Sequence, residues 1–305
     1  YKVAFPNNNI QFVYSGNYVI KVYPMGDPEN PALIKRFMIS EKSVLIKPEP
    51  QRSKLTIGYD THQQVDFTVD HPGFNIIDPN RSVFATILQN GRWDNARVNL
   101  KPDFIRTGQI AFNDISGKCN FPGGNEFRYF DIKSLRYQTE YVRSIEYFEG
   151  RYHVYLIPSL NRGSSEYFYW QDFNGKYYVA LQEGRDPEIE SDYVFVYFTL
   201  PASFPVRDGN VYVYGALTDW SISDANRMYY NSDEHRYELT LLLKQGWYNY
   251  LYVVADDKGI IVPDQEFESD HFETENDYII LIYYRNPSGR YDRLVGSRSF
   301  NTLAR

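Results

Sequence analysis

Three aromatic residues are the first candidates for binding chemistry in this sequence. Trp220 closes the strand-and-turn stretch VYVYGALTDW, and Tyr250 and Tyr252 belong to the Tyr-rich run WYNYLYVV. Aromatic platforms bind sugars by stacking, with a gain of about 1–3 kcal/mol per ring by analogy with nucleobase stacking. Trp220, Tyr250 and Tyr252 therefore form a candidate glycan site. The alternative is that the Trp220 ring folds over the end of a β-sandwich.

A second candidate is the acidic stretch PDQEFESDHFETEND, residues 263–277. Calcium requires roughly six to eight oxygen ligands from a loop with a sharp turn, which usually contains glycine. This stretch has no glycine. The acidic residues Glu266, Glu268 and Asp270 occupy every second position, and the apolar Phe267 lies between two of them. Such alternation favours a solvated edge strand, whose charges prevent edge-to-edge pairing. The carboxylates of the stretch are Asp264, Glu266, Glu268, Asp270, Glu273, Glu275 and Asp277.

Motifs for catalysis are absent from the sequence. It contains no H-E-x-x-H, no G-x-S-x-G and no P-loop, and no two histidines are four residues apart. In GGNEFR, Glu126 and Arg128 would point to the same face of a strand, so we expect them to form an ion pair. As a general acid, Glu126 would need a second carboxylate at glycosidase spacing. We predict no enzymatic activity and no cofactor. The scattered histidines are His62, His71, His153, His235 and His271.

Short β-strands are the elements that must position these residues. Aromatic residues make up 17% of the chain, with 29 Tyr and 20 Phe, about twice the usual proportion. Tyrosine suits strands with a half-wet face, because its ring packs while its hydroxyl stays hydrated. Turn residues separate the strand-like runs, so any helix should be a short connector. We predict an all-β protein of tandem Ig-like β-sandwiches. The runs include residues 12–23, 33–41, 63–69, 82–93, 152–158 and 193–200.

Two Asn-Gly pairs predict tight turns. Asn90-Gly91 and Asn174-Gly175 each lie between aromatic or β-branched flanks. The type I′ turn, one of the primed turns, needs positive φ at both central residues, which Asn and Gly tolerate best. We therefore expect two hairpins.

The length of 305 residues suits two or three domains. KPEPQRSK, Lys47–Lys54, and PASFPVRDG, Pro201–Gly209, are candidate linkers because of their prolines and charges. They divide the chain into residues 1–46, 47–200 and 201–305. The first piece is too small to close a sandwich. We expect it to be the end of an Ig-like domain whose earlier strands precede residue 1, or else to pack on the middle domain.

Composition excludes several classes of protein. The lone Cys119 excludes an intrachain disulfide and a cysteine-based zinc site. The net charge is −7 without a basic stripe, which argues against nucleic acid as a partner. The apolar run YIILIYY, Tyr278–Tyr284, has the length of a strand, so we predict no transmembrane segment.

Residues 205–300 present a strand, a turn with tryptophan, a second strand, a hairpin and a last strand. This order resembles the early-set Ig-like sandwiches related to glycogen-binding modules. In the sugar-binding members a second exposed tryptophan follows the acidic turn, where this sequence has ADDKGIIV. We therefore interpret Trp220 as a structural ring. The matching residues are Gly215, Leu217, Trp220, Gly246, Tyr250, Tyr252, Asp256 and Asp257.

Longer and rarer motifs extend the resemblance to most of the chain. QNGRWDNA, GGNEFR and ENDYIILIYYRNPSGRYDRLVG are similar to the Bacteroidota family of type IX secretion-system plug proteins. The resemblance implies a periplasmic, non-enzymatic protein at the inner face of the outer membrane. Its partner would be the outer-membrane translocon β-barrel, whose periplasmic opening it closes. Members normally begin with a leader and a longer first Ig-like domain, so we expect the sequence to be truncated at its amino end.

Two other functions remain open as alternatives. A carbohydrate-binding β-sandwich of the envelope is the alternative that Trp220 and the strand order suggest. An envelope hydrolase ranks last, because no two groups are arranged for acid and base roles. The resemblance does not indicate which residues form the interaction surface.

Overall fold

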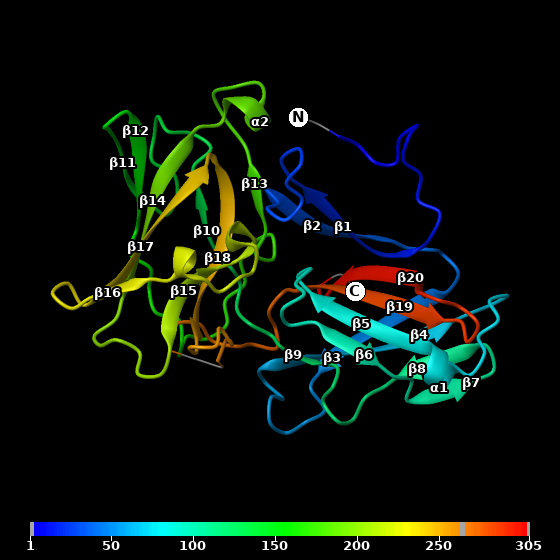
Figure 1. Cartoon of the computed structure of the whole chain (residues 1–305). Helices are drawn as coiled ribbons and strands as arrows, with labels where there is room; N and C mark the ends of the chain where they lie inside the picture. Colours follow the sequence, from blue (N-terminus) through cyan, green and yellow to red (C-terminus); the bar gives the residue numbers. More distant parts are fainter. Residues whose placement is uncertain (1–2, 263–265, 304–305) are drawn as a thin grey trace. The chain divides into compact units, whose positions relative to one another are not determined.

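The structure is a computed structural model and describes residues 3–262 and 266–303. Unit 1 consists of residues 1–59, 63–121 and 276–305, and unit 2 consists of residues 60–62 and 122–275. β-strands and turns build both units, which confirms the all-β class (Figure 1). The α-helices α1 (Pro79–Ser82) and α2 (Pro187–Glu190) are single turns, as expected of short connectors. No helix within the described ranges is long and apolar enough to cross a membrane.

Two facing sheets and a hairpin form unit 1. One sheet has the order β3-β4-β8-β7 with β9 on β4, the other has the order β20-β19-β5-β6, and β1 pairs with β2. The buried side chains between the two larger sheets include Phe67, Ile87 and Ile280. The strands are β1 (Gly16–Val22), β2 (Leu33–Ile39), β3 (Leu45–Arg52), β4 (His62–Asp70), β5 (Val83–Gln89), β6 (Arg97–Leu100), β7 (Phe104–Arg106), β8 (Gln109–Phe112), β9 (Asn120–Pro122), β19 (Asp277–Arg285) and β20 (Asp292–Asn301).

The proline-rich stretch at Lys47–Lys54 is a strand rather than the linker that the sequence predicts. Its residues up to Arg52 belong to β3, which pairs with β4 along its whole length, with Pro48 opposite Phe67 and Pro50 opposite Val65. β3 lies at the edge of its sheet in the described part of the chain. Proline lacks an N–H but is tolerated on an edge strand, where one side of the backbone has no partner.

The last two strands also differ from the expected organisation. β19 pairs with β5 over Tyr278–Tyr284 and with β20 on its other side. Its side chains are buried on both faces, in two different clusters, as is normal for a central strand. The compact units therefore do not follow the boundaries at residues 46 and 200 that the sequence predicts, because residues 276–305 join unit 1. The assignment of residues 1–46 to an Ig-like domain stays a prediction.

Unit 2 is a second sandwich. A five-stranded sheet has the order β11-β12-β14-β17-β16, and the facing sheet has the order β10-β18-β13, with β15 also on β18. The core between them includes Phe130, Val196, Phe198 and Tyr248. The elements are β10 (Arg128–Asp131), β11 (Val142–Phe148), β12 (Arg151–Leu156), β13 (Tyr177–Val179), β14 (Tyr193–Pro201), β15 (Asn210–Tyr214), η1 (Ala216–Thr218), η2 (Asp224–Asn226), β16 (Tyr229–Asn231), β17 (Arg236–Lys244) and β18 (Gly246–Ala255).

Strand β14 shows how the sequence pattern produces the sandwich. Its even-numbered residues, such as Val194 and Val196, are buried in the core, whereas Tyr193 is exposed. Successive side chains of a strand point to opposite faces, so the alternation YVFVYFTL buries one face and leaves the other half-wet. The second predicted linker begins with the last residue of this strand, Pro201. The rest of that stretch is a loop within unit 2.

Both Asn-Gly pairs adopt the predicted backbone. Asn90 and Gly91 have φ values of 55° and 72°, and Asn174 and Gly175 have 52° and 77°. The first pair connects β5 and β6, which pair with each other. The second is a turn in front of β13 but has no strand before it, so it is not the hairpin that we expected.

Candidate functional site

Charged residues from three distant segments meet in unit 2 around Glu268. Arg128, the first residue of β10, donates from Nε to Glu268 Oε1 at 2.7 Å. Arg162, from the loop after β12, donates from Nε to Glu268 Oε2 at 2.8 Å. All three side chains are almost buried, with exposed fractions of 10–12%. The expected pair of Arg128 with Glu126 is therefore wrong, because Glu268 from the acidic stretch takes the place of Glu126.

Glu126 is instead a fully buried carboxyl. Its Oε1 accepts hydrogen bonds from the Tyr167 hydroxyl at 2.6 Å and from the Glu275 backbone N–H at 3.1 Å. Its Oε2 accepts none from the described residues. Burial raises the pKa of Glu126, and the hydrogen bond from Tyr167 opposes this shift only in part.

Asp172 lies close enough to Glu126 for the two charges to repel. Its carboxylate accepts from the backbone N–H of Asn174 at 2.6 Å and from that of Phe127. Burial raises the pKa of Asp172 to about 7, and the charge of Glu126 adds to the effect. Two carboxyls with raised pKa values are a feature of some active sites. Here both are closed to solvent, with exposed fractions of 0% for Glu126 and 6% for Asp172, so a substrate has no access to them as they lie.

The acidic stretch is a packed loop rather than the solvated edge strand that the sequence suggests. Its described residues before β19 form no strand. Phe267 is buried in the core of unit 2. Asp270 Oδ1 accepts from the Gly124 backbone N–H at 2.9 Å, and the His271 N–H donates to the Gly124 carbonyl at 2.8 Å. Asp264 lies outside the described residues.

Glycine is required where this loop crosses the GGNEFR turn. A Cβ at Gly123 would lie 1.9 Å from the His271 carbonyl oxygen, which no real contact allows. Sequence reasoning missed the loop that packs on these two glycines. It also missed Arg162 and Asp172, whose partners lie far away along the chain. No group of three or more His, Cys, Asp or Glu side chains in residues 3–262 and 266–303 is arranged to hold a metal ion.

The three aromatic candidates do not form a common platform. Tyr250 and Tyr252 are buried, with exposed fractions of 4% and 2%, and both hydroxyls contact the Ser159 hydroxyl, at 3.2 and 2.9 Å. Burial also raises the pKa of Tyr252. Neither ring presents a face to solvent, so the glycan role expected for these two tyrosines does not fit the structure.

Trp220 is half-buried and packs on its own unit. Its ring makes edge contacts with Tyr214 at 5.4 Å and Phe127 at 6.0 Å between centroids. A Cβ at Gly175 would lie 2.2 Å from the ring, so the glycine of the second Asn-Gly turn makes room for the tryptophan. The backbone of Trp220 is left-handed, with a φ of 54°, which is uncommon for a bulky residue. This geometry fits a structural ring at the end of the sandwich.

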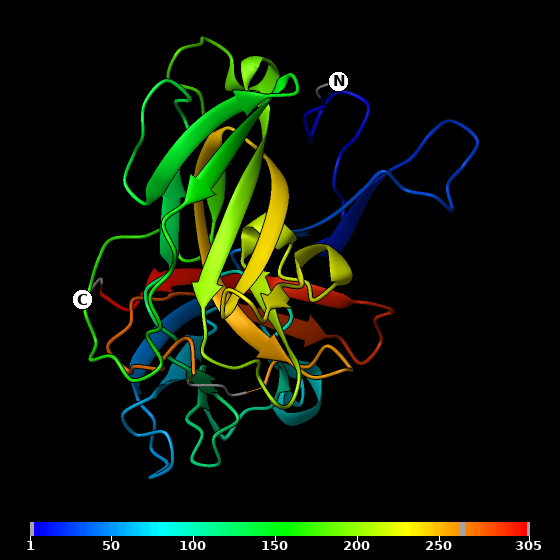
Figure 2. The same cartoon turned by 90° about the vertical axis from the view of Figure 1, so that its left-hand side faces the viewer.

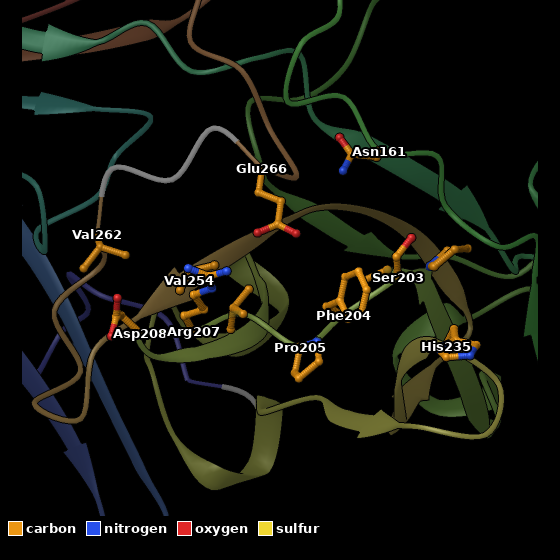
Figure 3. A pocket seen from close by; sticks show the side chains of 13 residues that line it. Asn161, Ser203, Phe204, Pro205, Arg207, Asp208, His235, Val254, Val262 and Glu266 are labelled. Carbon is orange, nitrogen blue, oxygen red and sulfur yellow. The ribbon is translucent and has the colours of Figure 1, made fainter.

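An open groove of about 990 Å³ lies elsewhere on unit 2 (Figure 3). The loop after β14 supplies most of its lining, including Phe204, which is 78% exposed. Val254 and Val262 contribute further apolar surface. The polar residues around them carry both signs of charge and do not define one ligand: Asn161, Arg207, Asp208, His235 and Glu266.

Comparison with known proteins relates the chain to a protein family and to solved structures. Residues 1–41 match the family model described as type 9 secretion system plug protein, 1st domain. The whole chain is similar to a hypothetical protein from Parabacteroides merdae ATCC 43184, whose crystal structure is known. The two are 32% identical and superpose with a TM-score of 0.91, over 98% of this chain and 75% of the other. Among curated proteins none matches this sequence.

Proposed function

The chain belongs to the type 9 secretion system plug protein family, and from this premise we propose that it plugs the outer-membrane translocon of that system. In this proposal the protein is periplasmic, lies at the inner face of the outer membrane and has no enzymatic activity. It closes the periplasmic opening of the translocon β-barrel when no substrate is passing.

The observation that carries the proposal is the match of residues 1–41 to the first domain of the plug proteins. The similarity to the Parabacteroides merdae protein, over 98% of this chain and 75% of the other, supports a shared architecture. A plug must withstand contact with a channel without unfolding, and the buried network around Glu268 ties three segments of unit 2 together.

The environment of the carboxyl groups supports a role without catalysis. Glu126 and Asp172 are two buried carboxyls with raised pKa values, and their exposed fractions are only 0% and 6%. General acid–base catalysis needs a group within hydrogen-bond reach of the substrate. Their hydrogen bonds to Tyr167 and to backbone N–H groups instead hold the GGNEFR turn and the acidic loop in place.

Co-purification tests the proposal. Affinity-tagged protein, extracted with mild detergent from the envelope of its own host, should bring down the translocon barrel. Deletion of the gene should raise the permeability of the outer membrane to a large antibiotic such as vancomycin, and a plasmid copy should restore the barrier. Absence of the barrel from the extract together with unchanged permeability would refute the plug function.

A further inference from the structure

The outer face of the five-stranded sheet in unit 2 carries a continuous group of rings. We call it the outer aromatic face and define it by Phe148, His153, Tyr155, Tyr193, Phe195 and Tyr197. The register places these residues side by side on β11, β12 and β14, because His153 lies opposite Phe195 and Tyr155 opposite Tyr197. The core-facing residues of β14 have the other parity, so this face points away from the sandwich. Figure 2 shows these strands, in green, on the side toward the viewer.

The rings of this face hold one another in fixed positions. Phe148 stacks on His153 with centroids 3.6 Å apart, and Tyr155 stacks on Tyr197 at 4.4 Å. A hydrogen bond of 2.8 Å joins His153 Nδ1 and the Tyr197 hydroxyl. The flat sides of these rings are turned toward neighbouring rings, with interplanar angles of 13° and 16°. They are therefore poorly placed to stack on a sugar.

Three cations lie over the rings of this face. The Arg143 guanidinium is 5.6 Å from the Tyr155 centroid, Arg151 is 5.4 Å from Phe195, and the Lys244 ammonium is 5.6 Å from Tyr193. Stacking of this kind fixes a guanidinium before any partner arrives, so less side-chain entropy is lost on binding.

The charge of the face is opposite to that of the whole protein. Arg143 and Arg151 form no ion pair within residues 3–262 and 266–303. The same face carries one carboxylate, that of Glu146, which lies opposite His153. Farther along the sheet, Arg236 pairs with Glu238 at 2.5 Å and with Glu234 at 3.4 Å. Around the rings of the outer aromatic face, Arg143, Arg151 and Lys244 outnumber the one carboxylate, Glu146, although the net charge of the chain is −7.

Arginine and tyrosine with this arrangement are typical of the centres of protein interfaces. We propose that the outer aromatic face is the surface by which this protein docks onto an acidic surface of its protein partner. The inference rests on the proposed function, in which that partner is the translocon barrel. Carboxylates of the partner pair with Arg143 and Arg151, and the exposed parts of Phe148 and Tyr193, at 41% and 59%, supply the apolar contact.

Charge reversal on the full chain tests the inference against a matched control. The variant R143E/R151E reverses two charges on the outer aromatic face. The control R207E/K258E makes the same change in net charge at two exposed positions off this sheet, one of them in the open groove. Binding of each protein to the purified translocon barrel in detergent is measured by surface plasmon resonance, after circular dichroism has established that the variants are folded.

We expect R143E/R151E to lose at least about tenfold in affinity, since close charge pairs dominate such contacts, and R207E/K258E to bind like wild type. Wild-type affinity in R143E/R151E would overturn the inference and leave the plug function intact. A loss of affinity for the barrel in R207E/K258E alone would assign docking to the open groove instead. If the wild-type protein itself does not bind the barrel, the proposed function and this inference both fail.

Two further measurements decide which partner uses the face. A photoreactive phenylalanine at Phe148 should cross-link to the barrel, and one at Phe168, which is 71% exposed, should not. Vesicles of phosphatidylglycerol are the second probe. The vesicles could bind the wild type but not R143E/R151E, while both proteins bind the barrel equally well. In that case the face is a membrane-binding surface and the inference is overturned.

Discussion

Arg128 and Glu268 form an almost buried ion pair at 2.7 Å although 140 residues separate them in sequence. Arg162 shares the same carboxylate, and its guanidinium also lies 5.1 Å from the Trp170 ring. One carboxylate thus holds two guanidinium groups from different segments. Removal of a single partner from such a group leaves a buried charge without compensation.

The variant Glu268→Ala should therefore destabilise the protein strongly. We expect a loss of about 3–5 kcal/mol in the free energy of unfolding, because both arginines remain buried without their carboxylate. Asp224→Ala is the control, since it breaks an exposed pair with Arg227 and should cost at most about 1 kcal/mol. Urea unfolding followed by circular dichroism measures both. Similar unfolding midpoints for the two variants would contradict the structural role of Glu268.

Neighbouring glycines in the GGNEFR turn should differ in their tolerance of alanine. Gly123→Ala places a Cβ against the His271 carbonyl, so the loop must move and its hydrogen bonds to Gly124 are strained. Gly124→Ala meets open space, and its φ of +70° limits the cost to the left-handed backbone strain of about 1–2 kcal/mol. Thermal unfolding should show a clearly larger loss for Gly123→Ala. The close approach of the acidic loop would be wrong if the order were reversed.

The stability of the protein should depend on the protonation of Asp172. Burial raises its pKa to about 7, so the folded state binds this proton more tightly than the unfolded state does. The group therefore favours folding at low pH, and this contribution is lost as the pH rises from about 4 through 7. Asp172→Asn should flatten the decline in stability between about pH 4 and pH 7 by up to about 1.4 kcal/mol per pH unit.

Titration of Asp172 can also be observed directly. The ¹³C chemical shift of its carboxyl, assigned from the spectrum of Asp172→Asn, should have its midpoint near the raised value. Asp208→Asn, at the rim of the groove, serves as the control for unfolding and should keep the wild-type pH profile. A midpoint below 3.8, the ordinary value of an aspartate, would mean that the hydrogen bonds from Asn174 and Phe127 outweigh the burial of the carboxyl.

Trp220 should matter for stability and not for sugar binding. Trp220→Ala removes the contacts with Tyr214 and Phe127, at a cost of about 2–4 kcal/mol for a half-buried ring. Trp220→Phe keeps part of this packing and should cost less. Titration with maltoheptaose should leave the tryptophan fluorescence of the wild type unchanged. A saturable change that disappears in Trp220→Phe would restore the carbohydrate-binding alternative.

Local features of the sequence determined the fold class and several details. The alternation in β14 established which residues are buried, because side chains of a strand point to opposite faces in turn. The Asn-Gly pairs determined positive φ, since few other residues adopt it without strain. The missing second tryptophan favoured the interpretation of Trp220 as a structural ring, and long motifs such as QNGRWDNA indicated the family.

Only the tertiary structure decided which segments meet. Alternation of apolar and polar residues predicts which face of a strand is buried but not which strand pairs with it. The pairing of β19 with β5 could therefore not be predicted from the sequence. Pro48 and Pro50 were mistaken for a linker because the edge position that tolerates them depends on the complete sheet. The pair of Arg128 with Glu268 also depends on the tertiary structure, because 140 residues separate the two in sequence. The alternation of residues around Glu126 predicts which side chains share a face but not which distant loop packs against them.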